Sequence, residues 1–325
     1  MQTLTEEITK SVRCIRANYD IDSLVFSFIL SKRAQVPLAV SFSKDSDCEL
    51  ILARNREGNS LAFNKTTYYI GRTSFTSILE PAKDDIVPYA VAILFSLVYE
   101  RRGPSELEAK RVEALKGFGL ESENGPKLLG YHELPLFTSL TITIDPYIPE
   151  VSGNRNGAEG VLKELKIDLT SKFDELSDAQ RNSLLYRIAV SMQRFNPNVT
   201  SSDIIAERYF VDGMDLLELT YASMLALDLI GASAIYEFIA NPSFSRALIS
   251  LYREEMGKGF SLGEVSEKGN AIYVSTNLKS PLLVRQILVQ GGKLKGDKTV
   301  IIKNGDRAYT SRFFMDSDKE GLIRV

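Results

Sequence analysis

The segment "VRCIRANYDIDSLVFSFILSKRAQ", residues 12–35, decides the expected fold. Its first part, residues 12–17, is a short apolar run bounded by polar residues, which indicates a buried strand. From Ser23 onward apolar residues recur at helical spacing, and Asp22 or Ser23 can cap a helix there. Asp20 and Asp22 are therefore expected in a loop between a strand and a helix.

The residues that follow continue an alternation of strands and helices. "PLAVSFS" (37–43) and "CELILA" (48–53) are typical of buried strands, and residues 60–71 predict a strand or hairpin. Two helices are expected at 87–101 and 104–116. This order favours an α/β fold with a parallel, doubly wound sheet, in which ligands bind at the carboxyl ends of the strands. Asp20 and Asp22 would lie at such an end.

The second half of the chain predicts a smaller α/β unit. A Gly/Asn-rich stretch (150–157) precedes an expected helix, and a long amphipathic helix (176–195) can be capped by Ser177 or Asp178. We expect a first domain at 1–175, a connecting helix at 176–200 and a second domain at 201–325. The second domain is expected to contain helices at 214–240 and 244–256, and strands at 270–276, 299–304 and 309–315.

Composition limits the class of protein. With 325 residues, 44% of them hydrophobic, the chain can form two packed domains. Its longest apolar stretch (87–99) is broken by Pro88 and Ser96, which indicates a buried helix and no membrane contact. The N-terminus lacks the pattern of a signal peptide, and Cys14 and Cys48 are the only cysteines. We therefore expect an intracellular, cytoplasmic protein with free thiols.

Positive charge is concentrated near the C-terminus. Residues 277–315 contain eight Lys or Arg and two Asp, so this segment has a charge of +6. The remaining residues sum to −9, which gives the net charge of −3 for the whole chain. Such a segment can attract phosphates, or it can be an ordinary solvated face. Tyr309, Phe313 and Phe314 could add base stacking, unless a strand buries them. The candidate DNA-binding residues are Lys293, Lys295, Lys298, Lys303, Arg307 and Arg312.

Three segments together resemble a known family. "NYDIDS" (18–23) resembles the first motif of the DHH phosphoesterases, which include the RecJ exonucleases. "LPLFTSLTITIDPYIPEVSGNRNGAEGVLKELKI" (134–167) resembles archaeal RecJ-like proteins, and residues 215–241 are similar to the helix that opens their DHH-associated domain. The resemblance implies a DHH-type sheet domain followed by a DHH-associated domain.

The chain departs from this family where the nucleases bind metal. Those enzymes hold two metal ions, usually manganese, with aspartates of four motifs and an Asp-His-His triplet. Here Asn18 replaces the first His, Ser23 replaces the Gly, and residues 48–72 contain Glu49 and Glu57 but no Asp. Two carboxylates from one loop cannot enclose two metal ions.

We therefore interpret Asn18, Asp20 and Asp22 as a vestigial motif without metal, cofactor or catalytic residue. Asp22 is expected to cap the helix and Asp20 to bind backbone amides. The single histidine, His132, is expected to be an ordinary surface or satisfied residue. In "QGGKLKGDK" (290–298), Gly291 and Gly292 match the family's glycine-rich loop, with lysines in place of its His. A tight turn is the alternative there.

The resemblance to inactive RecJ-like proteins implies a non-catalytic subunit of the archaeal replicative helicase. Such a subunit would bind the GINS complex, support the MCM ring and contact single-stranded DNA through the basic segment. The alternative is a divergent single-strand nuclease or nucleotide phosphodiesterase that uses Asp20, Asp22, Asp84 and Asp85. A DNA-binding protein outside replication is a third reading.

Overall fold

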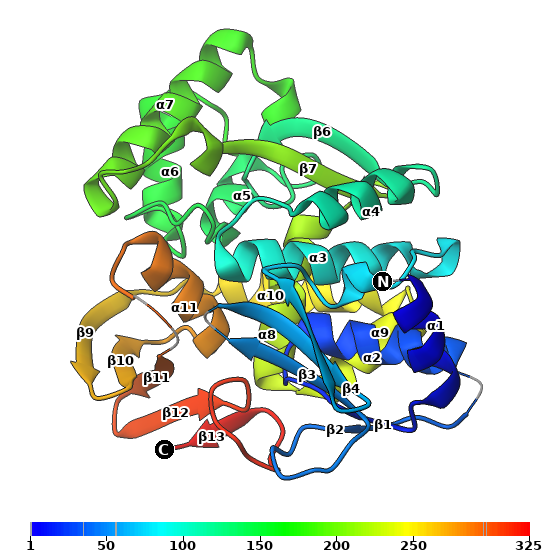
Figure 1. The fold of residues 1–325 in the computed structure, drawn as a ribbon. Coiled ribbons are helices and arrows are strands. Elements are labelled where there is room, and N and C mark those ends of the chain that lie inside the picture. Colours follow the sequence, from blue (N-terminus) through cyan, green and yellow to red (C-terminus); the bar gives the residue numbers. More distant parts are fainter. Residues whose placement is uncertain (1, 35, 56, 295, 297) are drawn as a thin grey trace.

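The structure is a computed structural model that describes residues 2–34, 36–55, 57–294, 296 and 298–325. In Figure 1 two sheets, one from each end of the chain, lie side by side below a layer of helices. A lobe formed by the middle of the chain lies above that layer. The fold is α/β, as the sequence predicts.

The first sheet has the strand order β2-β1-β3-β4-β5. β1 pairs in parallel with β2 and with β3, whereas β4 and β5 are antiparallel. Because β3 and β4 are joined by a short turn, no crossover helix can return the chain to a parallel position. The expected all-parallel sheet is therefore wrong beyond the first three strands. The strands are β1 (Cys14–Arg16), β2 (Ala39–Ser41), β3 (Leu50–Asn55), β4 (Gly58–Phe63) and β5 (Thr66–Gly71).

Helices of the first half pack beside this sheet. The apolar sequence "IVPYAVAILFSLVYE" of α3 is buried along most of its length, and its hydropathy predicts this. A capping box of Ser105 and Glu108 begins α4. The helices are α1 (Gln2–Ser11), α2 (Ile21–Arg33), α3 (Ile86–Glu100) and α4 (Glu106–Lys116), with 3-10 turns η1 (Thr76–Ile78) and η2 (Lys83–Asp85).

The middle of the chain forms a lobe with its own hydrophobic cluster, from Leu128 to Phe210. The helix α7 lies where the connecting helix is expected, and Ser177 caps it. The sheet of this lobe joins segments far apart in sequence, which local patterns do not reveal. The elements are β6 (Glu121–Pro126), α5 (Leu136–Ile142), α6 (Arg155–Glu164), η3 (Phe173–Glu175), α7 (Asp178–Phe195), η4 (Ser201–Asp203), β7 (Ile205–Val211) and β8 (Met214–Asp215).

The helix α8 (Leu216–Leu229) is central to the larger hydrophobic cluster, which extends from Leu4 to Ile302. Every residue from Leu216 to Asp228 is buried, and α8 packs against α3 of the first half. The single helix expected at 214–240 is wrong, because the chain breaks at Gly231 (φ +111°). A Cβ there would also collide with the side chain of Glu320. Two helices follow, α9 (Ala232–Ala240) and α10 (Phe244–Gly257).

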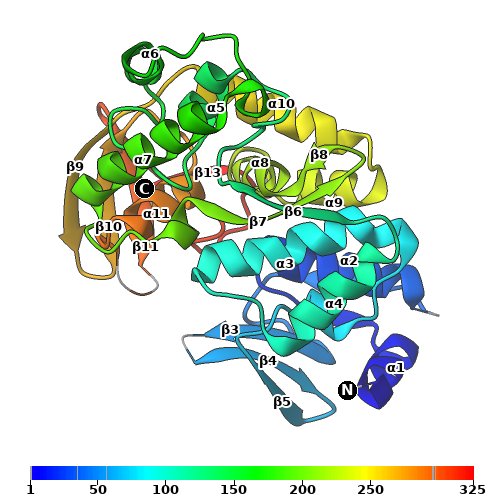
Figure 2. The ribbon, with the colours of Figure 1, turned by 90° about the horizontal axis from the view of Figure 1, so that it is seen from above.

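The C-terminal sheet has the strand order β13-β12-β11-β10-β9. Only β10 and β11 are parallel, and α11 connects them. Figure 2 views the molecule along a perpendicular direction. The domain boundaries at residues 175 and 200 stay a prediction. The elements are β9 (Leu262–Lys268), β10 (Ala271–Thr276), α11 (Pro281–Gln290), β11 (Thr299–Asn304), β12 (Arg307–Ser311) and β13 (Leu322–Arg324).

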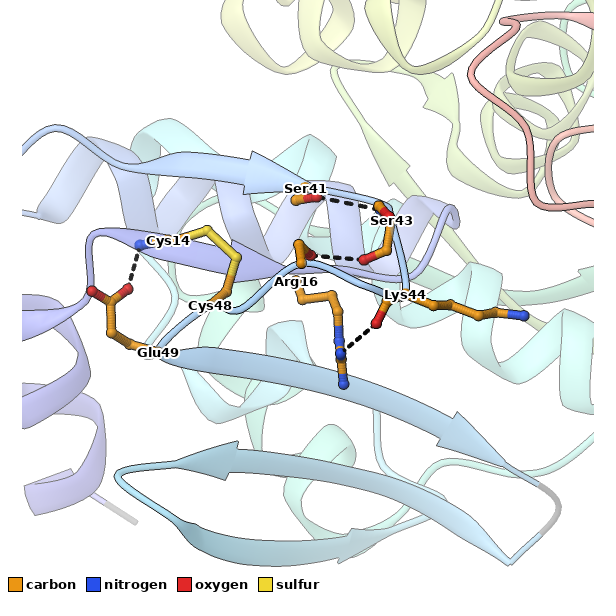
Figure 3. Close-up of a disulfide and its surroundings, with 8 residues drawn as sticks. Cys14, Arg16, Ser41, Ser43, Lys44, Cys48 and Glu49 are labelled. Atoms are coloured by element: carbon orange, nitrogen blue, oxygen red, sulfur yellow. Dashed lines mark hydrogen bonds between the residues drawn. A yellow bond between two sulfur atoms is a disulfide. The ribbon is translucent and has the colours of Figure 1, made fainter.

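A disulfide joins Cys14 to Cys48, so the expectation of free thiols is wrong. Figure 3 shows this bond between the start of β1 and the residues before β3. The Cα atoms are 4.9 Å apart because β1 and β3 are neighbouring parallel strands, which the sequence separation of 34 residues does not reveal. The backbone N–H of Cys14 also donates to the Glu49 carboxylate (2.8 Å).

Candidate functional site

Asp20 is the N-cap of α2, at the carboxyl end of β1. Its Oδ1 accepts a hydrogen bond from the backbone N–H of Ser23 (2.8 Å), and its backbone is extended, as an N-cap requires. This contradicts the expectation that Asp22 or Ser23 caps the helix. Asn18, which stands where the DHH motif has His, donates from its side-chain amide to the Ser23 hydroxyl (3.3 Å).

Asp22 lies two residues further, in the first turn of α2, and binds backbone amides, the role expected of Asp20. Its carboxylate accepts from the backbone N–H groups of Phe75 (2.8 Å) and Thr76 (3.0 Å), at the start of η1. The Ser96 hydroxyl of α3 adds a third hydrogen bond (3.3 Å). Asp22 is fully buried and thus joins α2, η1 and α3.

Arg54, near the end of β3, inserts its guanidinium between these carboxylates. Its nitrogens lie 3.4 Å from Asp20 Oδ2, 3.0 Å from Asp22 Oδ2 and 3.0 Å from Glu100 Oε1. The side chain is only 13% exposed. The rings of Phe75 and Phe95 lie 5.7 and 5.9 Å from the guanidinium carbon. A protein cation therefore pairs with all three carboxylates and offsets part of their charge.

Burial and charge act in opposite directions on this cluster. Burial raises the pKa of Asp22 to about 6, with Asp20 adding to the effect, even though Arg54 and the amides of Phe75 and Thr76 lower it. Burial disfavours the charged form of Arg54, but Asp20, Asp22 and Glu100 outweigh it and hold the pKa of the guanidinium above its usual value.

The residues at this site do not fit the two-metal cluster of the DHH nucleases that the sequence resembles. A guanidinium lies within 3.4 Å of each carboxylate, and it cannot activate water as a metal ion does. Within the residues that the structure describes, no three His, Cys, Asp or Glu side chains are grouped to share a metal ion.

The other acidic candidates lie away from this cluster. Asp85 pairs with Lys32 (2.6 Å) and Arg33 (3.2 Å), at the opposite end of α2 from Asp20. Three turns of helix separate the two ends by roughly 17 Å. The alternative ligand set that includes Asp85 is therefore wrong, because α2 holds these residues apart. Glu49 binds the Cys14 amide, at the amino end of β1.

His132 is a satisfied histidine, as expected. Its Nδ1 lies 2.5 Å from Asp174 Oδ2 and its Nε2 lies 2.7 Å from Glu123 Oε1. Partial burial lowers the pKa of His132, but the two carboxylates outweigh this and raise it above its ordinary value. The imidazole thus links β6 to η3 and lies outside the acidic cluster.

A cleft of about 710 Å³ opens beside Arg54. Lys44, Arg72 and Arg285 line it together with Tyr19, Tyr99 and Phe313. A second cavity of about 490 Å³ shares five lining residues with it and adds Arg16, Arg312 and Phe314. We refer to the two cavities together as the cleft. They form one concave surface with cationic and aromatic side chains, which also contains the carboxylates of Asp20 and Glu100.

Most cations of this cleft come from the first half of the chain. Among the described residues, Lys44 and Arg72 are exposed and have no carboxylate within ion-pair distance. Arg285 donates to the Tyr99 carbonyl (3.0 Å), and its guanidinium carbon lies 3.8 Å from the centre of the Tyr99 ring. The sequence pattern predicted that Asp20 and Asp22 lie together at the strand end. It did not indicate that Arg54 and Glu100 belong to the same site.

The predicted basic residues at the C-terminal end are dispersed. Lys298 pairs with Glu267, and Arg312 pairs with Glu320 (2.5 Å) while lying over the Tyr19 ring. Only Arg312 of the described candidates lines the cleft. The remaining ones are Lys293 above the Phe195 ring, Lys303 above the Tyr273 ring, exposed Arg307, and Lys295, which lies outside the described residues.

The aromatic candidates are partly used in packing. Phe313 makes an edge contact with Tyr99 (5.3 Å between centroids) and lines the cleft. Phe314 packs on Phe313 (4.9 Å), and Tyr309 is half-buried in β12. Phe313 and Phe314 therefore line the cavities, whereas Tyr309 lines neither of them.

The segment 134–167 joins the lobe to the C-terminal half. Buried Asp145 contacts Lys127 (3.1 Å) and accepts from the Tyr221 hydroxyl of α8 (2.6 Å). The Tyr147 backbone N–H donates to Gln290 Oε1 (2.7 Å), and the Gln290 amide donates to the Ile144 carbonyl (2.9 Å). The segment thus fixes the end of α11, from which the glycine-rich loop departs beside the cleft.

The fold and site define an α/β protein in which an arginine pairs with the acidic strand-end motif. The family model of archaeal Cdc45 matches residues 1–325, so the chain belongs to this family of Cdc45-like replication factors. The suspected resemblance to the inactive archaeal RecJ-like subunit is thereby confirmed. Among curated proteins, none matches the chain. In the described part of the chain, no helix has the length and apolar character needed to cross a bilayer.

Replacing Arg54 tests whether the guanidinium holds the cluster together. Arg54→Met leaves the buried carboxylates of Asp20 and Asp22 without their cation, so we expect the free energy of unfolding to fall by about 3–5 kcal/mol at pH 8. Exposed Arg246→Met in α10 is the control. Urea unfolding at several pH values measures both variants, and an equal, small change in the two would contradict the role of Arg54.

The same variant has a defined pH dependence. In the unaltered fold, the pKa of Asp22 (about 6) exceeds its unfolded value of 3.8, so this group contributes stability at low pH that is lost as pH rises through 6. Without Arg54 that pKa rises further. The free energy of unfolding that Arg54→Met loses should therefore be smaller at pH 5 than at pH 8. Adding Asp22→Asn to the same chain should restore part of the lost stability at pH 8.

Proposed function

We propose that this protein is a non-catalytic subunit of the archaeal replicative helicase, which binds the GINS complex and supports the MCM ring. We also propose that the first sheet belongs to a DHH-type domain and that the C-terminal half forms a DHH-associated domain. Membership of the archaeal Cdc45 family supports it. The observation that carries the non-catalytic part is the guanidinium of Arg54 among Asp20, Asp22 and Glu100.

The charge cluster supports a structural role rather than hydrolysis. Two-metal enzymes need ions that polarise a water molecule and stabilise the departing oxygen. Arg54 has a pKa above its usual value, so it has no proton to exchange near neutral pH, and its two terminal nitrogens pair with Asp22 and Glu100. Asp20 and Asp22 are in turn occupied by the amides of Ser23, Phe75 and Thr76.

The cleft supports contact with single-stranded DNA. Its side chains combine exposed cations, Lys44 and Arg72, with the rings of Tyr19, Tyr99 and Phe313. Such surfaces attract a phosphate backbone and stack bases without reading sequence. We therefore place the proposed DNA contact in the cleft and not on the C-terminal segment as a whole. Of the C-terminal candidates that the structure describes, only Arg312 lines the cleft. A location inside the cell, near the nucleoid, belongs to the same proposal.

A nuclease assay tests the absence of catalysis. We expect the purified chain to leave labelled single-stranded DNA uncut in the presence of manganese or magnesium. Any background cleavage should equal that of an Asp20→Ala, Asp22→Ala double variant. Cleavage by the unaltered chain that this double variant lacks would overturn the proposal. Circular dichroism of the double variant confirms that the comparison is made on folded protein.

A sizing experiment tests the partner. The chain and the GINS complex, mixed at micromolar concentration, are expected to elute together, because a helicase subunit must keep its partner at cellular concentrations. The separate components, run alone, provide the reference volumes. Elution of the mixture as two unchanged peaks would contradict the proposed function.

Salt-dependent DNA binding tests the cleft. Lys44→Glu with Arg72→Glu should weaken binding of an oligonucleotide and reduce the slope of log affinity against log salt by about 1.4, roughly 0.7 for each lost contact. Exposed Lys83→Glu with Lys163→Glu, outside the cleft, is the matched control. Equal affinity of both variants, measured by fluorescence anisotropy, would exclude the cleft. A loss on Lys293→Glu with Lys298→Glu instead would favour the C-terminal residues.

A further inference from the structure

A small apolar cavity lies between α3, α4 and β7, away from the cleft. Its volume is about 190 Å³, and α3 and α4 lie side by side next to it (Figure 2). Leu94 and Leu120 are buried in its lining, whereas Leu97 and Val112 are half-buried and Ala109 is exposed. We call this cavity the apolar slot.

The rim of the slot is polar and carries an excess of negative charge. The Lys116 ammonium lies between the carboxylates of Glu113 (3.5 Å) and Glu207 (3.3 Å). The Tyr209 hydroxyl donates to Glu207 Oε2 (2.8 Å). Glu113 is 76% exposed and Glu207 is 47% exposed. Because Lys116 is shared by both, one negative charge on the rim is left to attract a cation.

The size of the slot limits its occupant. Pockets for small-molecule ligands usually have volumes of roughly 300–1,000 Å³, so the slot is too small for a typical one. It is large enough for one apolar side chain. An apolar pocket with a polar rim is the usual arrangement where a partner protein anchors a central residue.

We propose that the apolar slot docks one large apolar side chain of a partner protein, next to which the partner carries a lysine or arginine for the rim carboxylates. The apolar side chain would pack against Leu97 and Val112, and the cation would lie beside Glu113 and Glu207. This inference rests on the proposed function, because it takes the GINS complex as the partner that supplies the anchor.

Two alanines of α4 provide a matched test. Ala109 lines the slot, whereas Ala114 is exposed on the same helix and does not line it. We expect Ala109→Trp, which fills the slot, to weaken binding of GINS at least tenfold in calorimetry. Ala114→Trp should bind within twofold of the unaltered chain. Ala109→Glu, which puts a carboxylate at the mouth without needing space, should also weaken binding.

The rim is tested separately by reversing a charge. Glu113→Lys should weaken GINS binding several-fold at low salt and less at high salt, whereas Glu237→Lys at an exposed position of α9 should not. Unchanged binding in Ala109→Trp and Ala109→Glu would overturn the slot while leaving the proposed partner intact. Failure of the unaltered chain to bind GINS would overturn the proposed function. It would also overturn the proposal that the slot is the surface that binds GINS.

Discussion

The guanidinium of Arg54 is the interaction on which the organisation of the first half depends. It contacts carboxylates from α2 and α3, and Glu100 in turn contacts Arg102 (2.9 Å). Arg102 pairs with fully buried Glu108 of α4, which also accepts from the Ser74 amide (2.8 Å). Four carboxylates and two arginines thus connect β3 with three helices. Since buried charges are costly unless paired, each member requires the others to stay in place.

An arginine beside the carboxylates limits what this strand end can do. A divalent ion leaves coordination positions open for water and substrate, whereas a guanidinium presents fixed donors in one plane. In this protein those donors meet protein carboxylates, so the acidic motif is used to stabilise its own fold. The cleft beside it keeps exposed cations, Lys44 and Arg72, and is therefore free to serve as a binding surface.

Sequence patterns predicted the elements whose signals are local. The strand at residues 12–17, the hairpin near 60–71 and the helices α2, α3, α4, α7 and α10 were found, because hydrophobic periodicity and caps lie within each segment. The roles of Asp20 and Asp22 were exchanged, since the amides that bind Asp22 come from η1, 53 residues away. Arg54, the Cys14–Cys48 bond and the pairing of β6 with β7 depend on similarly distant contacts.

The burial of α8 also has a consequence for synthesis on the ribosome. The helix α3 packs against α8, yet more than a hundred residues separate the two in the chain. At the usual translation rate of roughly 5–20 residues per second, many seconds pass between the synthesis of α3 and that of α8, and the apolar surface of α3 stays uncovered during this time. Nascent chains of the first two hundred residues therefore expose the apolar surface that α8 later covers, and the large hydrophobic core is completed only late in translation.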